Sequence, residues 1–429
     1  MRNIVQRIWQ APDLRKKIIF TVAILIFYRL LTHISTPGVN IEGLKAIFNR
    51  NNILGAFSLL TGGSAESFSI VMMGISPYIN ASIILQLLAV IIPKFENLKK
   101  EGKQGQEIIN RYTRYLTFPL AFLQSYGMIL LLNSQAPIIS DVSDWKIVLP
   151  IMLITSSGTV LLVWLGELIS EKGIGNGISL LIFTSIISRI PQLIGQNLSL
   201  ITTGDQQLVV KFASIAIITL VLTIIVTLFT EAHRRIPITY GAQKRSSVDS
   251  SLPIRVNQAG MIPIIFAVSI LTFPVIVAQV FSSSTNPLIQ SVASFILNHL
   301  QETGLTYIST YFVLILLFTY FYVSITFDTD LVAENIQKRG GFIPGIRPGK
   351  QTSEYIKKVS DAMNLYGGVF IGAIATIPLL IQFTFSEWNL GSAALLISGA
   401  GIIIVVGVVL DLSRQIQTEL MLHHYKKLY

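Results

Sequence analysis

Two glycine-containing segments have residue types that could bind a phosphate or a nucleotide, but neither has the spacing that this chemistry needs. Gly345–Thr352 (GIRPGKQT) contains the glycine, lysine and threonine of a phosphate-binding loop. However, Pro344 occupies the first required glycine position and Gln351 follows the lysine, so the segment fails the motif. Gly173–Gly177 (GIGNG) lacks dinucleotide-binding spacing and follows an apolar run rather than a strand. It is better interpreted as a tight connector between two helices.

Metal and nucleophile chemistry is not expected either. His423 and His424 are adjacent, and neighbours on a helix point in different directions, which disfavours a shared metal ion. The chain has no cysteine, so disulfides and thiolate metal ligands are excluded. No nucleophile with a partner base is recognisable. We therefore predict a protein that is not an enzyme and has no catalytic residue, metal site or cofactor.

Charged residues within apolar runs could mark an ion or proton path, because a charge near the centre of a bilayer is costly. Only Arg29 is clearly inside such a run, where we expect it to reach the membrane surface or a neighbouring helix's carbonyls. Glu167 and Asp411 lie near the ends of their runs, where water can reach them. This scarcity of embedded carboxylates weakens the hypothesis of an ion-coupled carrier.

The elements that position these residues are expected to be membrane-spanning helices. Of the 429 residues, 52% are hydrophobic and only 13% are charged, about half the charge of a soluble protein. The apolar runs are continuous rather than alternating, which favours helices over a β-barrel. The sequence predicts an all-α polytopic membrane protein with ten spans: Ile18–Ile34, Ile75–Ile92, Leu116–Leu132, Ile147–Leu165, Ile178–Ile194, Phe212–Phe229, Ala259–Phe281, Tyr307–Phe327, Ala362–Phe383 and Gly391–Leu412.

The basic residues orient these spans. Most of the 32 lysines and arginines lie in the N-terminal segment, the tail and every second gap between the runs. The opposite gaps hold only Lys45, Arg50, Lys146, Arg189 and Lys211. By the positive-inside rule, both termini are predicted to be cytoplasmic. The net charge of +10 follows from this topology or indicates an anionic partner such as lipid or nucleic acid.

Ten spans divide into two halves of five, residues 1–204 and 205–429, predicted to have opposite topology around a central pore. The second half has two large cytoplasmic loops, 231–256 and 328–360. In the first half, Gly55–Gly74 is apolar but too short and too interrupted by Gly, Ser and Glu66 to span. Such a segment is either re-entrant beside a water-filled cavity or an ordinary outer loop with a surface helix.

Several long stretches resemble the SecY family, the protein-conducting channels of the Sec translocon, and the resemblance covers nearly the whole chain. Their order and spacing match the ten-span pattern of that family. The stretches are GISPYINASIILQLL (Gly74–Leu88), KKEGKQGQEIINRYTRY (Lys99–Tyr115), GIGNGISLLIF (Gly173–Phe183), RRIPITYGAQKR (Arg234–Arg245), LPIRVNQAGMIPIIFA (Leu252–Ala267) and FIPGIRPGKQT (Phe342–Thr352).

The resemblance implies three features inside the membrane. A ring of apolar side chains forms the waist of the pore: Ile79, Ile83, Ile182, Ile186, Ile265 and Ile404. A plug within Gly55–Gly74 closes the outer funnel as a short helix that blocks the cavity without joining the core, and includes Leu59, Leu60, Ser64, Phe68 and Ile70. A lateral gate between spans two and three and spans seven and eight contains Gln124. The alternative for the isoleucines is lipid contact or helix packing, and for Gln124 a helix–helix hydrogen bond.

The resemblance also implies a docking surface for the SecA motor and the ribosome on the two cytoplasmic loops. Its predicted residues are Arg234, Arg235, Lys244, Arg245, Arg347 and Lys350. The alternative is inner-face charge that only orients the spans. Further implied partners are the small subunits SecE and SecG, signal sequences, unfolded preproteins and membrane lipid.

The predicted function is the central pore subunit of the Sec preprotein translocase, a passive channel across the membrane and sideways into lipid. A secondary carrier of small solutes, also built from inverted repeats, is the alternative. An insertion scaffold without a conducting pore is a third possibility. The predicted location is a bacterial plasma membrane or a plastid thylakoid membrane, with both termini cytoplasmic or stromal.

Overall fold

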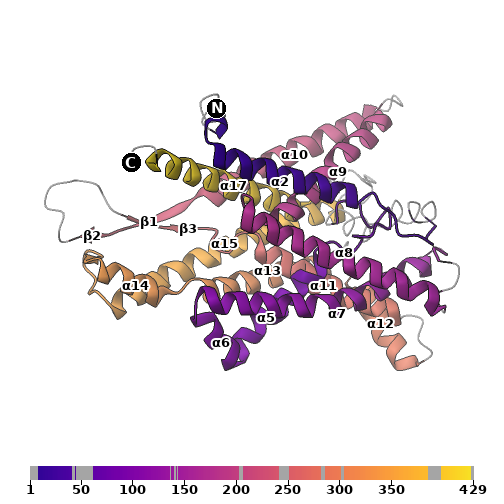
Figure 1. Ribbon diagram of the computed structural model, residues 1–429, viewed down its shortest axis with the longest axis horizontal. Helices are drawn as coiled ribbons and strands as arrows, with labels where there is room; N and C mark the ends of the chain where they lie inside the picture. The colour runs from indigo at the N-terminus through magenta and orange to yellow at the C-terminus, as the bar shows by residue number, and fades with distance from the viewer. Residues whose placement is uncertain are drawn as a thin grey trace.

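The computed structural model describes residues 8–40, 44, 61–135, 137–139, 142, 144–201, 206–240, 251–281, 286–300, 304–384 and 398–426. Most of its long helices run along the long axis of the molecule (Figure 1). These helices are α2 (Pro12–Leu31), α5 (Ser76–Ile91), α7 (Lys103–Gln135), α8 (Trp145–Lys172), α9 (Gly177–Ile201), α10 (Gln206–Glu231), α11 (Ile262–Phe281), α13 (Leu305–Thr326), α15 (Lys350–Thr384) and α17 (Gly399–Lys426).

Each of the ten predicted apolar runs falls on one of these helices, although residues 391–397 of the last run lie outside the described residues. Six described helices are long and apolar enough to cross a membrane, or up to 7 if the bent pair formed by α5 and α6 (Pro93–Lys100) is one span. The apolar parts of α9 and α11, Gly177–Pro191 and Ile262–Val275, are shorter. The predicted all-α polytopic architecture is confirmed, whereas the count of ten spans stays a prediction.

A proline lies near the end of each of these two shorter apolar stretches. Pro191 lies inside α9 and Pro274 inside α11, and a helical proline removes one backbone hydrogen bond and disturbs the preceding turn. In a membrane, such a break is tolerated where neighbouring protein groups satisfy the freed carbonyl. The sequence-based spans treated both runs as uninterrupted.

The GIGNG segment is the tight connector that its sequence predicts. It joins α8 to α9, and Gly175 has a φ of +89°, which suits glycine. The two helices then approach very closely, because a Cβ added to Gly177 would lie 1.9 Å from the carbonyl oxygen of Gly166. The Ile174 amide donates a hydrogen bond to Thr21 Oγ1 of α2 at 3.0 Å, which ties the connector to the first helix.

Apolar side chains between the helices form several buried clusters, two of which have buried members on α17. One contains side chains of α10, α11, α13, α15 and α17, with Phe266 and Ile315 among its buried members. The other lies among α2, α8, α9 and α17, around Tyr28, Leu162 and Ile404. The helices of the two predicted halves therefore share buried apolar contacts along α17.

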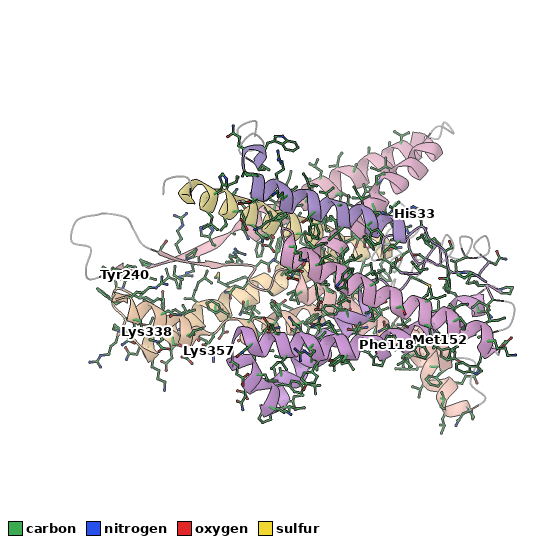
Figure 2. The ribbon with its side chains drawn as sticks, viewed as in Figure 1. His33, Phe118, Met152, Tyr240, Lys338 and Lys357 are labelled. Atoms are coloured by element: carbon green, nitrogen blue, oxygen red, sulfur yellow. The ribbon has the colours of Figure 1, made fainter. Side chains whose placement is uncertain are left out.

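The two large cytoplasmic loops predicted for residues 231–256 and 328–360 contain short strands, which the sequence analysis did not predict. β1 (His233–Pro237) pairs antiparallel with β3 (Ser251–Arg255), and β2 (Thr239–Tyr240) pairs antiparallel with β4 (Gly341–Phe342). The short helix α14 (Thr329–Lys338) precedes β4. The strands and α14 lie at one end of the long axis, the end where Tyr240, Lys338 and Lys357 gather (Figure 2), whereas His33 and Met152 lie toward the other.

Candidate functional site

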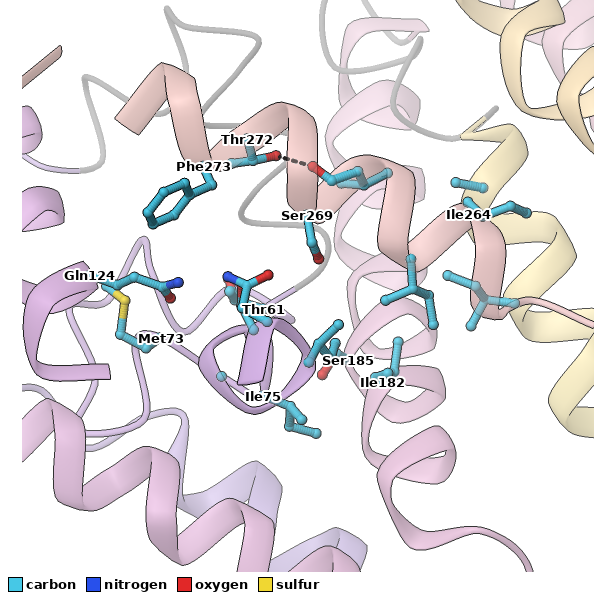
Figure 3. A pocket seen from close by; sticks show the side chains of 18 of the residues that line it. Thr61, Met73, Ile75, Gln124, Ile182, Ser185, Ile264, Ser269, Thr272 and Phe273 are labelled. Atoms are coloured by element: carbon cyan, nitrogen blue, oxygen red, sulfur yellow. Dashed lines mark hydrogen bonds between the residues drawn. The ribbon is translucent and has the colours of Figure 1, made fainter. Parts of the chain in front are cut away.

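A cavity of about 80 Å³ lies at the centre of the helices (Figure 3). Its wall is built from α2, α5, α7, α9, α11 and α17, together with residues of the segment between α2 and α5. Helices from both predicted halves thus meet around one space. Such a position is typical of a site built at the interface of two repeats.

Four of the six predicted ring residues line this cavity: Ile79, Ile182, Ile265 and Ile404. The other two do not line it. Ile83 is 3% exposed in the cluster around α11 and α13, and Ile186 packs against the cluster around α2 and α9. Each lies one helical turn from a lining partner. Their role in a ring stays a prediction.

The sequence analysis missed several other apolar lining residues, among them Ile75, Ile264 and Val268. Val268 follows Ile265 by three positions, so the two share one face of α11, and that spacing was the available signal. Ile264 is adjacent to Ile265, and helical periodicity alone does not select both. The apolar wall is therefore larger than the predicted ring.

Polar side chains line the part of the cavity between α7 and α11. Gln124 of α7 is only 6% exposed and borders the cavity together with Asn80, Ser269 and Thr272. Figure 3 shows Gln124 near Thr61 and Met73, with Ser269 and Thr272 on the facing helix α11. The Thr272 hydroxyl donates to the Val268 carbonyl oxygen at 2.8 Å, so its polar group is partly satisfied within α11. The predicted gate residue thus lies where α7 and α11 face each other.

The predicted plug segment is described from residue 61 onward, and Leu59 and Leu60 lie outside the described residues. Residues 61–75 form a series of turns, and the short helix expected within Gly55–Gly74 stays a prediction because residues 55–60 lie outside the described residues. An isolated antiparallel bridge joins Ser35 to Ser69. Two backbone hydrogen bonds flank it: the Thr36 amide donates to the Phe68 carbonyl at 2.8 Å, and the Ile70 amide donates to the Ile34 carbonyl at 3.0 Å.

The described part of this segment is also more deeply packed than expected. Phe68 is fully buried in a cluster with side chains of α7 and α8, and its φ of +43° is unusual for a bulky residue. Ser64, also predicted for the plug, is 1% exposed, and its hydroxyl donates to the Thr61 carbonyl at 2.9 Å. We expected the segment to block a cavity without joining the core. Instead, Thr61 borders the cavity while Phe68 belongs to the core.

The predicted docking residues that the structure describes are all exposed: Arg234, Arg235, Arg347 and Lys350. Lys244 and Arg245 lie outside the described residues. Arg234 and Arg235 belong to β1, whereas Arg347 and Lys350 lie between β4 and α15 and at the start of α15. They therefore come from two segments about a hundred residues apart in sequence.

A shared apolar core joins these two segments into a single unit. Its buried members include Ile236 of β1, Ile254 of β3, Ile343 after β4 and Ile356 of α15. The β2–β4 pairing, with Thr239 opposite Phe342, adds a backbone connection between the segments. We call the unit formed by residues 233–240, 251–255 and 329–359 the platform. Exposed cations are thus displayed on a packed support.

Backbone geometry fixes the position of Arg347 on the platform. Gly345 and Gly349 have φ values of +81° and +98°, so tight turns lie on both sides of the arginine. The Thr352 hydroxyl donates to the Arg347 carbonyl oxygen at 3.0 Å. These contacts stiffen the backbone and leave the guanidinium in solvent, where it can donate two parallel hydrogen bonds to a carboxylate or phosphate.

Comparison with known sequences decides the family. The SecY family profile matches residues 69–413. The chain belongs to the SecY family. Protein translocase subunit SecY of Mycobacterium tuberculosis (strain ATCC 25618 / H37Rv) is 38% identical over 436 residues, covering 96% of each chain. Protein translocase subunit SecY of Streptomyces coelicolor is 37% identical over 439 residues, covering 98% of each chain. The predicted family and the predicted class of function, a protein-translocation channel, are confirmed, and the solute-carrier alternative gains no support.

Solved structures have the same fold. A structure described as "The structure of a protein conducting channel" has a TM-score of 0.68 at 17% identity and covers 95% of this chain and 92% of the other. A second, described as "The plug domain of the SecY protein stablizes the closed state of the translocation channel and maintains a membrane seal", has a TM-score of 0.69 at 18% identity with the same coverage. A third, Sec61 in a canine ribosome–channel complex, has a TM-score of 0.64 at 16% identity. The family match and the apolar helices make the chain a multi-pass protein of a bacterial membrane.

Proposed function

We propose that this chain is the pore subunit of a protein translocase that conducts unfolded polypeptides across the membrane and releases apolar segments sideways into lipid. The observation that carries the proposal is the central cavity, where Ile79, Ile182, Ile265 and Ile404 converge from four helices. Family membership supplies the class of cargo. The channel is passive, and the energy comes from a motor or from translation.

Apolar side chains suit the waist of such a pore for two reasons. A hydrophobic constriction stops ions by dewetting. It also offers a passing polypeptide no strong polar contact that would retain it. The proposed waist contains all six isoleucines, with Ile83 and Ile186 one turn beyond the four that line the cavity.

The proposed lateral gate is the seam of α5 and α7 against α11 and α13. Gln124 and Asn80 on one side of the cavity and Ser269 and Thr272 on the other support this assignment. Polar groups in a helix seam hold it by contacts of modest strength, on the order of 1 kcal/mol each. Such a seam can open without a large barrier when an apolar segment competes for it.

The proposed docking surface is the platform, with Arg234, Arg235, Arg347 and Lys350 displayed to a motor such as SecA or to the ribosome. Lys244 and Arg245 are proposed to extend it. Its positive charge suits the phosphates of ribosomal RNA or the carboxylates of a protein. The small subunits SecE and SecG are the proposed partners within the membrane.

The proposed topology puts both termini and the platform in the cytoplasm of a bacterium. The charge bias of the loops supports it. The two inverted halves are proposed to be residues 1–204 and 205–429, and the plug is proposed to lie within residues 55–74. This arrangement gives the cytoplasmic side the docking surface and the outer side the plug.

The test is reconstitution of the chain, with its small membrane subunits, in liposomes of bacterial lipid. We expect a purified motor and ATP to drive a preprotein into a protease-protected state, and omission of either to abolish protection. Exchange of small solutes across the same liposomes, with no preprotein protection, would contradict the channel and favour a carrier.

A further inference from the structure

Two arginines on different helices contact the segment that borders the cavity. Arg189 of α9 forms an ion pair with Glu66, with Nη2 and Oε1 2.6 Å apart. Arg29 of α2 donates a hydrogen bond from Nη1 to the Gly62 carbonyl oxygen at 2.8 Å. The pore function proposed above uses neither arginine. In the sequence, Arg29 is the charge inside the first span, and Arg189 is one of the rare cations on the outer side.

The ion pair is largely removed from water. The Arg189 side chain is 7% exposed and that of Glu66 is 20% exposed. A buried ion pair differs from a surface pair because little water reaches its charges, so each charge depends more strongly on the other. The contact is therefore sensitive to loss of either charge, which exposed pairs are not.

The contact between the segment and α9 is also tight in the backbone. Gly62 has a φ of +66°, and an added Cβ would lie 2.8 Å from the Cα of Ser185. Ser185 is itself hydrogen-bonded to Tyr28 of α2, with the two hydroxyl oxygens 2.6 Å apart. Thr61, the next residue toward the cavity, lines it. The arginines thus hold the segment at the point where it meets the cavity.

We propose that the Glu66–Arg189 ion pair, assisted by the Arg29–Gly62 hydrogen bond, is a latch that sets how strong a signal sequence must be to displace this segment. The proposal rests on the channel function proposed above. It assigns the signal-sequence specificity of that channel to two charged residues that belong neither to the proposed isoleucine waist nor to the proposed gate at Gln124.

The location of the latch has a mechanical consequence. Arg29, Gly62, Glu66 and Arg189 all belong to the first 204 residues, whereas the proposed gate opens between α5 and α7 of that half and α11 and α13 of the other. Separation of the halves alone therefore does not pull the ion pair apart. Release of the segment is a second step, which the translocating chain has to drive.

The experiment measures signal stringency in the reconstituted translocase. The readout is the ratio of two rates: import of a reporter with a defective signal sequence over import of the same reporter with an intact one. We expect Glu66→Gln to raise this ratio about tenfold, the effect of a 1.4 kcal/mol change. Glu66→Arg should raise it further because three cationic side chains would then meet. The charge-exchanged pair Glu66→Arg with Arg189→Glu should return the ratio toward the original value.

The matched control is Arg114→Gln, which breaks the exposed ion pair between Arg114 of α7 and Glu167 of α8, 3.0 Å apart. We expect no change of the ratio. An unchanged ratio in Glu66→Gln, or an equal rise in the control, would overturn the latch. If Glu66→Gln does not accumulate in membranes, Arg189→Lys replaces it, with a smaller rise expected and no rise refuting the proposal. Failure of the unaltered chain to import the intact reporter would instead reject the channel function.

Discussion

Lys99 donates a hydrogen bond from Nζ to the backbone carbonyl oxygen of Ile325 at 2.7 Å. Lys99 belongs to α6, which bends 104° away from α5, and Ile325 lies in the last turn of α13. The last carbonyls of a helix have no partner within it and carry partial negative charge, so an ammonium there is favourable. Burial lowers the pKa of the Lys99 ammonium. The bond joins the two sides of the proposed lateral gate at one end, where α6 meets the C-terminal end of α13.

We predict that Lys99→Gln weakens this end of the gate by on the order of 1 kcal/mol, because a hydrogen bond from a charged donor is replaced by a weaker one or none. The gate should then sample open states more often. The measurement is the distance distribution between spin labels at Lys94→Cys and Ser324→Cys, both exposed positions. Labelling is specific because the sequence has no cysteine.

The matched control for the gate is Lys357→Gln, which removes an exposed cation of α15. The distance distribution should stay unchanged in this control and should broaden toward longer distances in Lys99→Gln. Identical distributions in both variants would show that the Lys99 contact does not restrain the gate.

The second prediction concerns the apolar cavity wall. Replacement of Ile79 or Ile404 by Asn places an amide in the constriction, so water and ions should enter it more easily. Because Ile404 is only 1% exposed, its Asn variant should also lose about 1–3 kcal/mol of stability. The measurement is ion conductance across planar bilayers. Ile217→Asn in α10 is the control, because Ile217 is 63% exposed and lies away from the cavity. Equal conductance in the cavity variants and the control would remove the two isoleucines from the waist.

The third prediction concerns the packing of the plug segment on α8. A Cβ at Gly158 would lie 1.9 Å from the Ile70 carbonyl oxygen, so Gly158→Ala has to push the segment away. We expect a loss of about 1–3 kcal/mol, typical of overpacking, seen as a lower midpoint of thermal unfolding in detergent. Gly407→Ala in α17 is the control, because nothing lies within 4 Å of its added Cβ. A midpoint of Gly158→Ala equal to that of Gly407→Ala would contradict this packing.

Burial of Phe68 also changes what a deletion should do. From the sequence, removal of about Leu59–Ile70 should leave a folded protein, since the segment was expected only to block a cavity. Removal of Phe68 from its cluster empties a large buried volume, which costs about 3–5 kcal/mol for a Phe side chain. We therefore expect a deletion that includes Phe68 to unfold at a lower temperature than the intact chain.

The sequence predicted the helices well because each apolar run is long and continuous, and that signal depends only on neighbouring residues. The tight connector between α8 and α9 at Gly173–Gly177 was likewise predicted from its glycines. The β1–β3 pairing was not predicted because its strands are short segments within one polar loop. The β2–β4 pairing was not predicted because Thr239 and Phe342 are about a hundred positions apart and their strands have only 2 residues each. Local patterns contain no information about such distant pairs.

The candidate site was readable only in part, for the same reason. Helical spacing puts Ile79 and Ile83 on one face of α5, but which of them borders the cavity depends on how α5 packs against α11 and α17. The ion pair of Glu66 and Arg189 could not be predicted from the sequence, since it joins residues 123 positions apart. Its only sequence signal was that a rare outer-side arginine and a lone carboxylate in an apolar segment each need a partner.

The last prediction concerns Arg347 on the platform. Its side chain is exposed, and its backbone is fixed by Gly345, Gly349 and the Thr352 hydroxyl. Arg347→Glu should therefore leave the thermal unfolding midpoint unchanged while it weakens motor-driven import, because an acceptor now faces a carboxylate or phosphate partner. A typical interface arginine contributes about 2 kcal/mol, so affinity for the motor or ribosome should fall more than tenfold.

Two variants distinguish a docking role of Arg347 from a role in which its charge only orients the spans. Arg347→Lys should be intermediate, because the charge survives but the two-pronged donor geometry does not. Lys172→Glu is the control, since Lys172 is an exposed cation at the C-terminal end of α8 and does not belong to the platform. Preprotein import into vesicles and a ribosome-binding titration are measured for all three. Full activity of Arg347→Glu in both assays would leave orientation of the spans as the only role of this arginine.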